Sequence, residues 1–343
     1  MGSDSDRPGL PVGKLPAELL TRLLAEEPVR DPRVLVGPGV GLDCAVIDLG
    51  EGRCLVAKSD PITFATDEIG WYAVQVNAND VATTGAVPRY FLATVLLPEA
   101  GADEALAESI LRQVRAACAE VGAELIGGHT EVTHGLGRPI LAGTMLGEVE
   151  RSRLVLPTGA RPGDRLILTK RLAVEATAIL AREKAPAPAG GVDEPLLERA
   201  RGFLRDPGIG VLRDARAALA AAPVHAMHDP TEGGLATALH ELAQAAGVGI
   251  EVDAGVPIYL ETLALCAPFG IDPWGVIASG SLLLAVAPED AGLVLASLAA
   301  AGVEGAAVGW VRDPAFGVVR VESGRRAPVP RFERDEIAKA FVT

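Results

Sequence analysis

Residues 69–98 read IGWYAVQVNANDVATTGAVPRYFLATVLLP, and this stretch decides the fold. Apolar residues recur at helical spacing from Ile69 to Val81, so the pattern predicts a helix over residues 69–84. Gly85 ends this pattern, and the β-prone run that follows predicts a strand over residues 90–97.

Two polar side chains interrupt the predicted helix. Asn77 and Asp80 are three residues apart, which places them side by side on one helical face, yet their neighbours Val76, Ala78 and Val81 are small or apolar. A solvated helix face is the simplest explanation. However, polar groups in a mostly buried helix require partners, and this favours contact with a metal or a nucleotide.

Further acids lie in other short motifs. Asp60 lies in VAKSDPIT, Glu131 lies in GGHTEV, and Asp229 opens DPTEGG. Carboxylates that share one pocket repel each other, so a fold keeps them together only where a cation neutralises them. Mg²⁺ with a phosphate ligand is the usual cation. The sequence therefore predicts a metal-nucleotide enzyme.

The other elements of the first half predict a mixed α+β unit. An amphipathic helix is expected over residues 15–26, and the β-prone runs CAVIDL and RCLVAKSD form a hairpin around the turn at residues 50–52. A helix over residues 103–121, a buried strand leading into a Gly-Gly pair, and a strand over residues 139–150 follow. This order predicts an antiparallel or mixed sheet with helices on one side.

A Pro- and Gly-rich break at residues 157–164 predicts a domain boundary. Beyond it we expect a strand at RLILT, a helix, a flexible surface loop over residues 183–195, a helix that begins at Asp229 and Pro230, and further alternating strands and helices. The second unit should be a layered α/β domain. The predicted division is an N-terminal extension and helix (1–33), a first domain (34–156), a second domain (157–330) and a tail (331–343).

The composition excludes several classes of function. The chain has 343 residues, 49% of them hydrophobic, and a formal net charge of −14. Such an acidic chain is a poor sequence-independent binder of nucleic acid, which requires clustered Lys and Arg. No apolar stretch reaches about 18 residues, and no basic segment precedes an apolar run at the N-terminus. We therefore expect a cytoplasmic protein without a nucleic-acid or membrane partner.

Four widely spaced cysteines form no CxxC pair, which favours buried, reduced thiols over a redox or metal role. His225 and His228 could form half of a Zn²⁺ site, but no third ligand is near in sequence, so we read them as loop residues. GPGVG at residues 37–41 lacks the GK[ST] ending of a Walker loop and is a weak phosphate signal. His129 and His134 fit a phosphate contact and a simple polar turn equally well.

The DPTEGG motif also has two interpretations. Asp229 could be an ordinary helix cap, or the helix N-terminus could present free N–H groups and its positive dipole end to a phosphate. Capping alone requires neither two glycines nor an acid at Glu232, so the sequence favours the phosphate interpretation.

Taken in order, GLDCAVI, AKSDPIT, residues 69–98, LIGGHTEVT, RPGDRLILTK and HDPTEGGLATALHELA resemble the AIR synthase (PurM) superfamily over residues 34–311. The last motif is most similar to HypE-like hydrogenase-maturation proteins, and IGWYAVQVNANDVATTGAVPR is also similar to thiamine-monophosphate kinase. The resemblance implies a homodimer whose N-terminal sheets form a shared barrel, with Mg-ATP in clefts near the dimer interface.

The resemblance also implies roles for individual residues. The implied catalytic residues are Asp229, Thr231, Glu232 and His129. The implied ATP-binding residues are Asp43, Lys58, Asp60, Asn77, Asp80, Gly128, Thr130 and Gly233. The implied Mg²⁺ ligands are Asp43, Asp60, Asp80 and Asp229.

Three features depart from the HypE pattern. The sequence ends EIAKAFVT without a Pro-Arg-Ile-Cys tail, His129 stands where an acid usually follows the two glycines, and ASGSLLLAV replaces an Asn-Glu-Gly segment. We therefore hypothesise a HypE-like, Mg-dependent, ATP-using enzyme that transfers phosphate to, or activates, an oxygen of a separate small-molecule or carrier-protein acceptor. The alternatives are a small-molecule kinase of the thiamine-phosphate type and a nucleotide-binding assembly protein without turnover.

Overall fold

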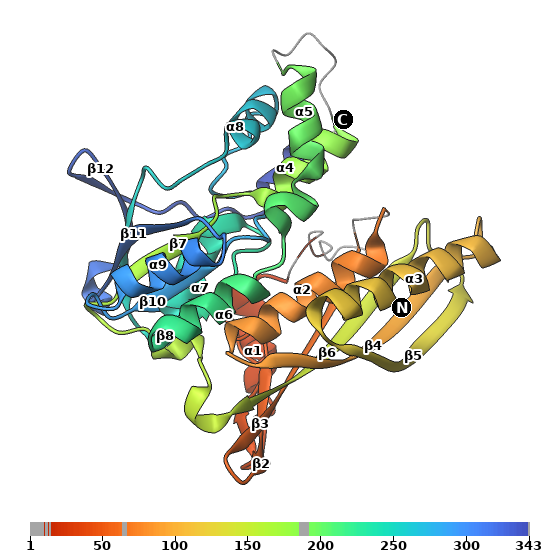
Figure 1. The fold of residues 1–343 in the computed structure, drawn as a ribbon, viewed down its shortest axis with the longest axis horizontal. Coiled ribbons are helices and arrows are strands. Elements are labelled where there is room, and N and C mark those ends of the chain that lie inside the picture. Colours follow the sequence, from red (N-terminus) through yellow and green to blue (C-terminus); the bar gives the residue numbers. More distant parts are fainter. Residues whose placement is uncertain (1–9, 11–12, 14, 64–66, 185–191, 342–343) are drawn as a thin grey trace, which may run out of the picture.

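The computed structural model describes residues 10, 13, 15–63, 67–184 and 192–341, and it contains two β-sheets with helices packed on them (Figure 1). The first sheet has the strand order β1-β2-β3-β6-β4-β5. Its strands are β1(Val34–Val36), β2(Ala45–Gly50), β3(Arg53–Ile62), β4(Val87–Pro98), β5(Glu124–Thr133) and β6(Ile140–Glu150). A short helix, α1(Ala17–Ala25), precedes them.

Helices α2(Ile69–Thr83) and α3(Glu104–Val121) cover one face of this sheet (Figure 1). Strands β4 and β5 pair in parallel, and the other pairs are antiparallel, so the predicted mixed sheet with helices on one side is confirmed. The prediction of a buried strand at the Gly-Gly pair was wrong. β5 is an edge strand, and Ile126 and Val132 on it are 52% and 58% exposed.

The second sheet has the order β13-β12-β9-β11-β7-β10-β8. Its strands are β7(Arg165–Thr169), β8(Val224–His228), β9(Gly249–Asp253), β10(Leu283–Val286), β11(Gly305–Arg312), β12(Val318–Glu322) and β13(Arg325–Pro328). Its helices are α4(Val174–Glu183), α5(Glu194–Gly202), α6(Leu212–Ala221), α7(Gly234–Ala246), α8(Leu260–Cys266) and α9(Ala291–Ala300). Short helical turns lie at η1(Arg151–Arg153), η2(Pro157–Gly159), η4(Leu204–Gly208), η5(Ala267–Phe269), η6(Pro314–Phe316) and η7(Glu336–Ala340).

Helices cover both faces of this second sheet. Leu166 and Leu168 of β7 belong to the core that includes α4 and α7, whereas Ile167 between them belongs to the core that includes α6 and α9. A strand that is buried on both faces carries a continuous apolar run rather than an alternating one, as RLILT does. The predicted layered α/β unit is therefore confirmed.

The flexible loop expected over residues 183–195 falls mostly on residues 185–191, which lie outside the described part of the chain; at its edges α4 ends at Glu183 and α5 begins at Glu194. One local prediction in this unit was wrong. His225 and His228 lie in strand β8 rather than in a loop. Within the described residues, no helix is both long and apolar enough to cross a membrane.

Helix α2 lies between the two units and contacts both of them. It packs between the first sheet and α6 (Figure 1), and fourteen of its fifteen residues are buried. The buried Asn79 makes the polar link: its Nδ2 donates to the carbonyl of Ile209 at 2.8 Å, and its Oδ1 accepts from the backbone N–H of Val211 at 2.8 Å.

Replacing Asn79 should weaken this link. In Asn79→Ala, a buried carbonyl and a buried N–H lose their partners, so the free energy of unfolding should fall by about 2–4 kcal/mol. Asn79→Asp keeps the acceptor but loses the donor and adds a buried charge, so it should also destabilise. Denaturant unfolding measures both variants, and an Asn79→Ala protein within about 0.5 kcal/mol of the parent would contradict this account.

Candidate functional site

The N-terminal unit brings four of the predicted residues together. Lys58 and Asp60 are two residues apart on β3, so both side chains lie on the same face of the sheet, the face that α2 covers. The Lys58 Nζ lies 2.9 Å from Asp80 Oδ2 and 3.8 Å from Asp60 Oδ2. Asn77 donates from Nδ2 to the carbonyls of Ala73, at 2.8 Å, and Asp60, at 3.3 Å. Asn77 and Asp80 are both buried, so the solvated-face interpretation was wrong.

The C-terminal unit supplies Asp229, which directly follows β8. Ligand atoms of Asp43, His228 and Asp229 lie within 4.8 Å of one another, which makes this group a candidate metal site. The His228 Nε2 lies 2.9 Å from Glu241 Oε2, and its Nδ1 lies 3.6 Å from Asp43 Oδ2. Sequence reasoning missed Glu241, and it considered His228 only as half of a Zn²⁺ site before reading it as a loop residue. The His-Asp pair at the end of an apolar strand was the signal for His228, because it adjoins Asp229.

Burial controls the charge of this cluster. Burial first, and then the nearby charges of Asp80 and Asp43, hold the pKa of Asp229 well above its usual value. Burial likewise raises the pKa of Asp80 to about 6, although the Lys58 charge opposes the shift. Burial lowers the pKa of Lys58, but the charges of Asp80, Asp60 and Asp43 outweigh it and raise that pKa overall. The positive charge of Lys58 therefore does not balance the negative charges of the clustered carboxylates.

The residues present fit a divalent cation. Asp229 is 1% exposed, and neither of its carboxylate oxygens accepts a hydrogen bond from a donor among the described residues. An ionised carboxylate in this position is unstable unless a cation or a donor meets it. Carboxylate oxygens are the ligands that Mg²⁺ prefers, so Asp43, Asp80 and Asp229 are the residues that could hold it. Asp60 is more exposed than Asp80, and it lies farther from the Lys58 Nζ, at 3.8 Å against 2.9 Å.

The DPTEGG segment does not form the helix start that its sequence predicts. Helix α7 begins at Gly234 rather than at Pro230, because Gly233 and Gly234 both adopt left-handed backbone angles, with φ of +79° and +63°. At Gly234, a Cβ atom would lie 2.6 Å from the carbonyl oxygens of Trp274 and Val276. The second glycine therefore allows α7 to approach this neighbouring loop closely.

The N-terminus of α7 is also less available to a phosphate than predicted. The N–H of Gly233 donates to Asp335 Oδ2 at 2.7 Å, and those of Gly234 and Ala236 donate to backbone carbonyls. Asp335, from the segment expected to be a tail, also accepts from the N–H of Ile277 at 3.2 Å. Its carboxylate already occupies the anion position at this helix end. Thr231 and Glu232 lie beside it, half-buried.

Three predicted residues lie apart from the acids within one chain. They are Gly128, His129 and Thr130, all on β5. In the sheet, Gly128 pairs with Ala93 of β4, and Ala93 pairs with Gly143 of β6. Gly143 in turn pairs with Asp60 of β3, three strands away from Gly128. Three strand spacings correspond to about 14 Å. His129 is exposed, and its Nε2 lies 3.2 Å from Glu131 Oε2. A single chain therefore does not bring these residues to the carboxylate cluster.

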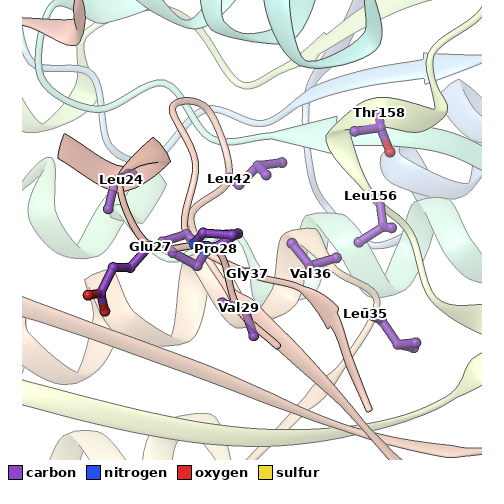
Figure 2. Close-up of a pocket in the computed structure, with 11 residues that line it drawn as sticks. Leu24, Glu27, Pro28, Val29, Leu35, Val36, Gly37, Leu42, Leu156 and Thr158 are labelled. Atoms are coloured by element: carbon purple, nitrogen blue, oxygen red, sulfur yellow. The ribbon is translucent and has the colours of Figure 1, made fainter. Parts of the chain in front are cut away.

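Gly37 and Pro38 of the glycine-rich 37–41 loop border a cavity of about 380 Å³ (Figure 2). Its lining is mostly apolar and comes from the α1 side, β1 and the link between the units. Lining residues include Leu24, Val29, Leu35, Val36, Leu42 and Leu156. None of the clustered acids lines it, so the chemistry-bearing groups lie outside this cavity.

The four cysteines are buried, as predicted. Burial raises the pKa of the Cys118 thiol to about 11 and that of the Cys266 thiol to about 12. Protonated thiols are poor nucleophiles and poor metal ligands. The core interpretation of the cysteines is therefore confirmed.

Comparisons with known proteins agree with this geometry. The AIR synthase related protein N-terminal domain matches residues 41–149, and the AIR synthase related protein C-terminal domain matches residues 161–322. "Carbamoyl dehydratase HypE" of Azotobacter vinelandii is 32% identical over 328 residues, which cover 92% of this chain and 89% of that protein.

Two solved structures share the fold. One is a hydrogenase maturation protein HypE in complex with ATP, with a TM-score of 0.66 and 24% identity, covering 93% of this chain and 91% of that one. The other is thiamine monophosphate kinase from Aquifex aeolicus, with a TM-score of 0.65 and 22% identity, covering 91% and 97% of the two chains. The two-domain fold expected from the sequence is confirmed.

The raised pKa of Asp80 predicts a pH-dependent stability. Its pKa is about 6 in the folded protein and 3.8 in the unfolded chain, so without metal the folded state binds the proton more tightly. The resulting stabilisation is complete below pH 3.8 and is lost as the pH rises through about 6.

Urea unfolding in EDTA between pH 4 and pH 7 measures this effect. The free energy of unfolding of the parent should fall by roughly 2.4 kcal/mol more than that of Asp80→Asn over this interval. Parallel pH profiles for the two proteins would show that Asp80 is not protonated in the metal-free site.

Proposed function

Because the chain belongs to the AIR synthase related protein family, we propose that it is a HypE-like, Mg²⁺-dependent, ATP-using enzyme. It transfers phosphate to, or activates, an oxygen of a separate acceptor. One observation carries the proposal: neither oxygen of the buried Asp229 carboxylate accepts a hydrogen bond from a donor among the described residues, and the negative charges of Asp43 and Asp80, which belong to the first unit, lie nearby. The likeness to HypE proteins supports the same assignment.

Asp43, Asp80 and Asp229 would hold Mg²⁺, which neutralises phosphate charge and polarises the phosphoryl group when it is bound. Asp43 and Asp80 come from the first unit and Asp229 from the second, so one ion would join the two. Lys58 lies at the edge of this cluster and provides a positive charge for a phosphate oxygen. Glu241 holds His228 in place beside Asp43.

We place the acceptor near Thr231 and Glu232, which follow Asp229 and remain half-buried. Their backbone is fixed, because the carbonyl of Thr231 accepts from the N–H groups of Gly234, at 3.0 Å, and Ala278, at 3.2 Å. Fixed groups around a reacting oxygen lower the barrier by holding it in line with the phosphate. The acceptor is a small molecule or a carrier protein, because all four cysteines are buried and unreactive.

We also propose that two copies form the dimer that the family resemblance implies. The outer face of the first sheet, opposite α2, carries Leu55, Leu92, Leu96 and Leu146, and none of these is fully buried in one chain. Pairing of two such faces is the common way to cover an apolar sheet. A second copy could then place His129 and Thr130 in a shared site.

Removing one metal-binding charge should abolish tight nucleotide binding. Asp80→Asn and Asp229→Asn keep the side-chain shape but remove a ligand charge, so Mg-ATP affinity should fall at least tenfold in calorimetry. The matched control is Glu104→Gln, on the exposed start of α3. Unchanged Mg-dependent binding in both Asp variants would refute the assignment.

Turnover separates an enzyme from an assembly protein. We expect Mg-dependent ATP hydrolysis that increases when candidate small molecules or carrier proteins are added, and that is lost in Asp229→Asn. ATP binding without any metal-dependent cleavage, across a broad acceptor screen, would indicate the non-catalytic alternative.

The dimer has its own test. Light scattering should give about twice the 35.4 kDa chain mass, and Leu92→Glu, which places a charge on the outer sheet face, should shift the mass toward one chain. A monomeric parent protein at micromolar concentration would contradict the shared-sheet model.

A further inference from the structure

A second cavity, of about 450 Å³, lies at the other end of the first sheet. It is lined by the start of β3 and β4, the end of β6, η1 and α6. Its lining residues are Arg53, Gly85, Val87, Arg89, Glu148, Val149, Glu150, Arg153, Arg216, Leu219 and Ala220. We call it the arginine groove. The first unit contributes its strands, and the second unit contributes α6, so both units line the groove.

The groove is separate from the candidate active site. Arg53 pairs with Glu150 in the sheet register, and Asp60 pairs with Gly143 at the other end of the same two strands. Seven residues of strand separate the two positions along β3, which corresponds to about 23 Å. A ligand in the groove would not contact the carboxylate cluster.

The charge of the groove is unusual for this chain. The protein has a net charge of −14, yet four arginines and only two glutamates line this cavity. Arg53 is paired with Glu148 at 3.1 Å. The side chains of Arg89, Arg153 and Arg216 form no hydrogen bond, ion pair or ring contact with the described residues. Like charges that share a cavity repel each other, and an anion relieves that repulsion.

The walls of the groove are fixed by the backbone. The N–H of Val155 donates to the carbonyl of Thr84 at 2.9 Å, and the N–H of Arg151 donates to the carbonyl of Gly52 at 2.8 Å. These bonds hold the segment that carries Arg153 against the end of α2 and the β2–β3 turn. Gly85, with φ of +77°, allows the Arg153 carbonyl to approach closely, because a Cβ there would lie 2.8 Å from it.

We propose that the arginine groove binds a phosphorylated small molecule. Guanidinium groups present planar, paired donors that match phosphate oxygens, and the net lining charge of +2 matches a phosphate dianion. The volume is that of a small-molecule site rather than of a protein interface. Since Arg89 belongs to the first unit and Arg216 to the second, the ligand would brace the two units against each other. This inference does not depend on the proposed function.

Calorimetry with pyrophosphate and with inorganic phosphate, on the full chain in EDTA, tests the proposal. The variant is Arg89→Ala/Arg153→Ala/Arg216→Ala. The matched control is Arg22→Ala/Arg115→Ala/Arg325→Ala, which removes three exposed arginines outside the groove. We expect pyrophosphate binding that is at least tenfold weaker in the groove variant and unchanged in the control and in Asp229→Asn.

Several outcomes would overturn the proposal. The first is that the parent protein binds neither pyrophosphate nor phosphate. The second is that the parent and the groove variant bind pyrophosphate equally well. The third is that binding is lost in Asp229→Asn but retained in the groove variant. Binding of an oligo-glutamate peptide but not of pyrophosphate would show that the groove receives an acidic protein segment instead. Thermal unfolding with and without pyrophosphate confirms that the groove variant is folded.

Discussion

The burial of helix α2 is the constraint on which the rest of the structure depends. A helix enclosed on nearly all sides must satisfy every polar side chain that it carries. Gln75 donates to Glu120, Asn77 donates to two carbonyls, and Asn79 joins the two units through the backbone around residue 210. Asp80 has the charge of Lys58 beside it, but the acids of two units surround the same position. Gln75 and Asn79 thus have structural partners, whereas the buried Oδ1 of Asn77 accepts no hydrogen bond from a described residue, and Asn77 and Asp80 are the polar residues of α2 left for chemistry.

The two units meet where negative charge accumulates. Asp43 and Asp80 come from the first unit and Asp229 from the second, and Lys58 is the positive charge beside them among the described residues that shift the pKa of Asp229. An ion at this point would favour the same arrangement of units that the Asn79 bonds favour. Asp335 accepts from the N–H of Gly233 at the α7 N-terminus, so in the proposed site a carboxylate-bound metal and Lys58, rather than that helix end, would meet the phosphate.

Much of this could be predicted from sequence, because the decisive signals are local. The 69–98 pattern fixes a helix and a strand, and the apolar spacing of RLILT indicates burial on both faces. Predictions failed where distant contacts decide. The two glycines at the start of α7 were read as a sign of phosphate binding, but a Cβ at Gly233 would collide with the Thr237 side chain, and Gly234 allows close packing on the loop at Trp274. His228 was read as a loop residue because neither of its partners is near in sequence: Asp43 lies in the first unit, and Glu241 lies in the following helix α7. Likewise, nothing local shows that β5 is an edge strand.

The central claim is that carboxylates from both units bind one cation together with ATP. Diffraction from crystals grown with Mn²⁺ and a non-hydrolysable ATP analogue tests this claim most directly, since Mn²⁺ replaces Mg²⁺ at oxygen ligands and gives an anomalous signal. The account predicts an anomalous peak in contact with Asp80 and Asp229, with the terminal phosphates beside Lys58. A nucleotide bound in the cavity of Figure 2, with no metal at Asp229, would contradict it.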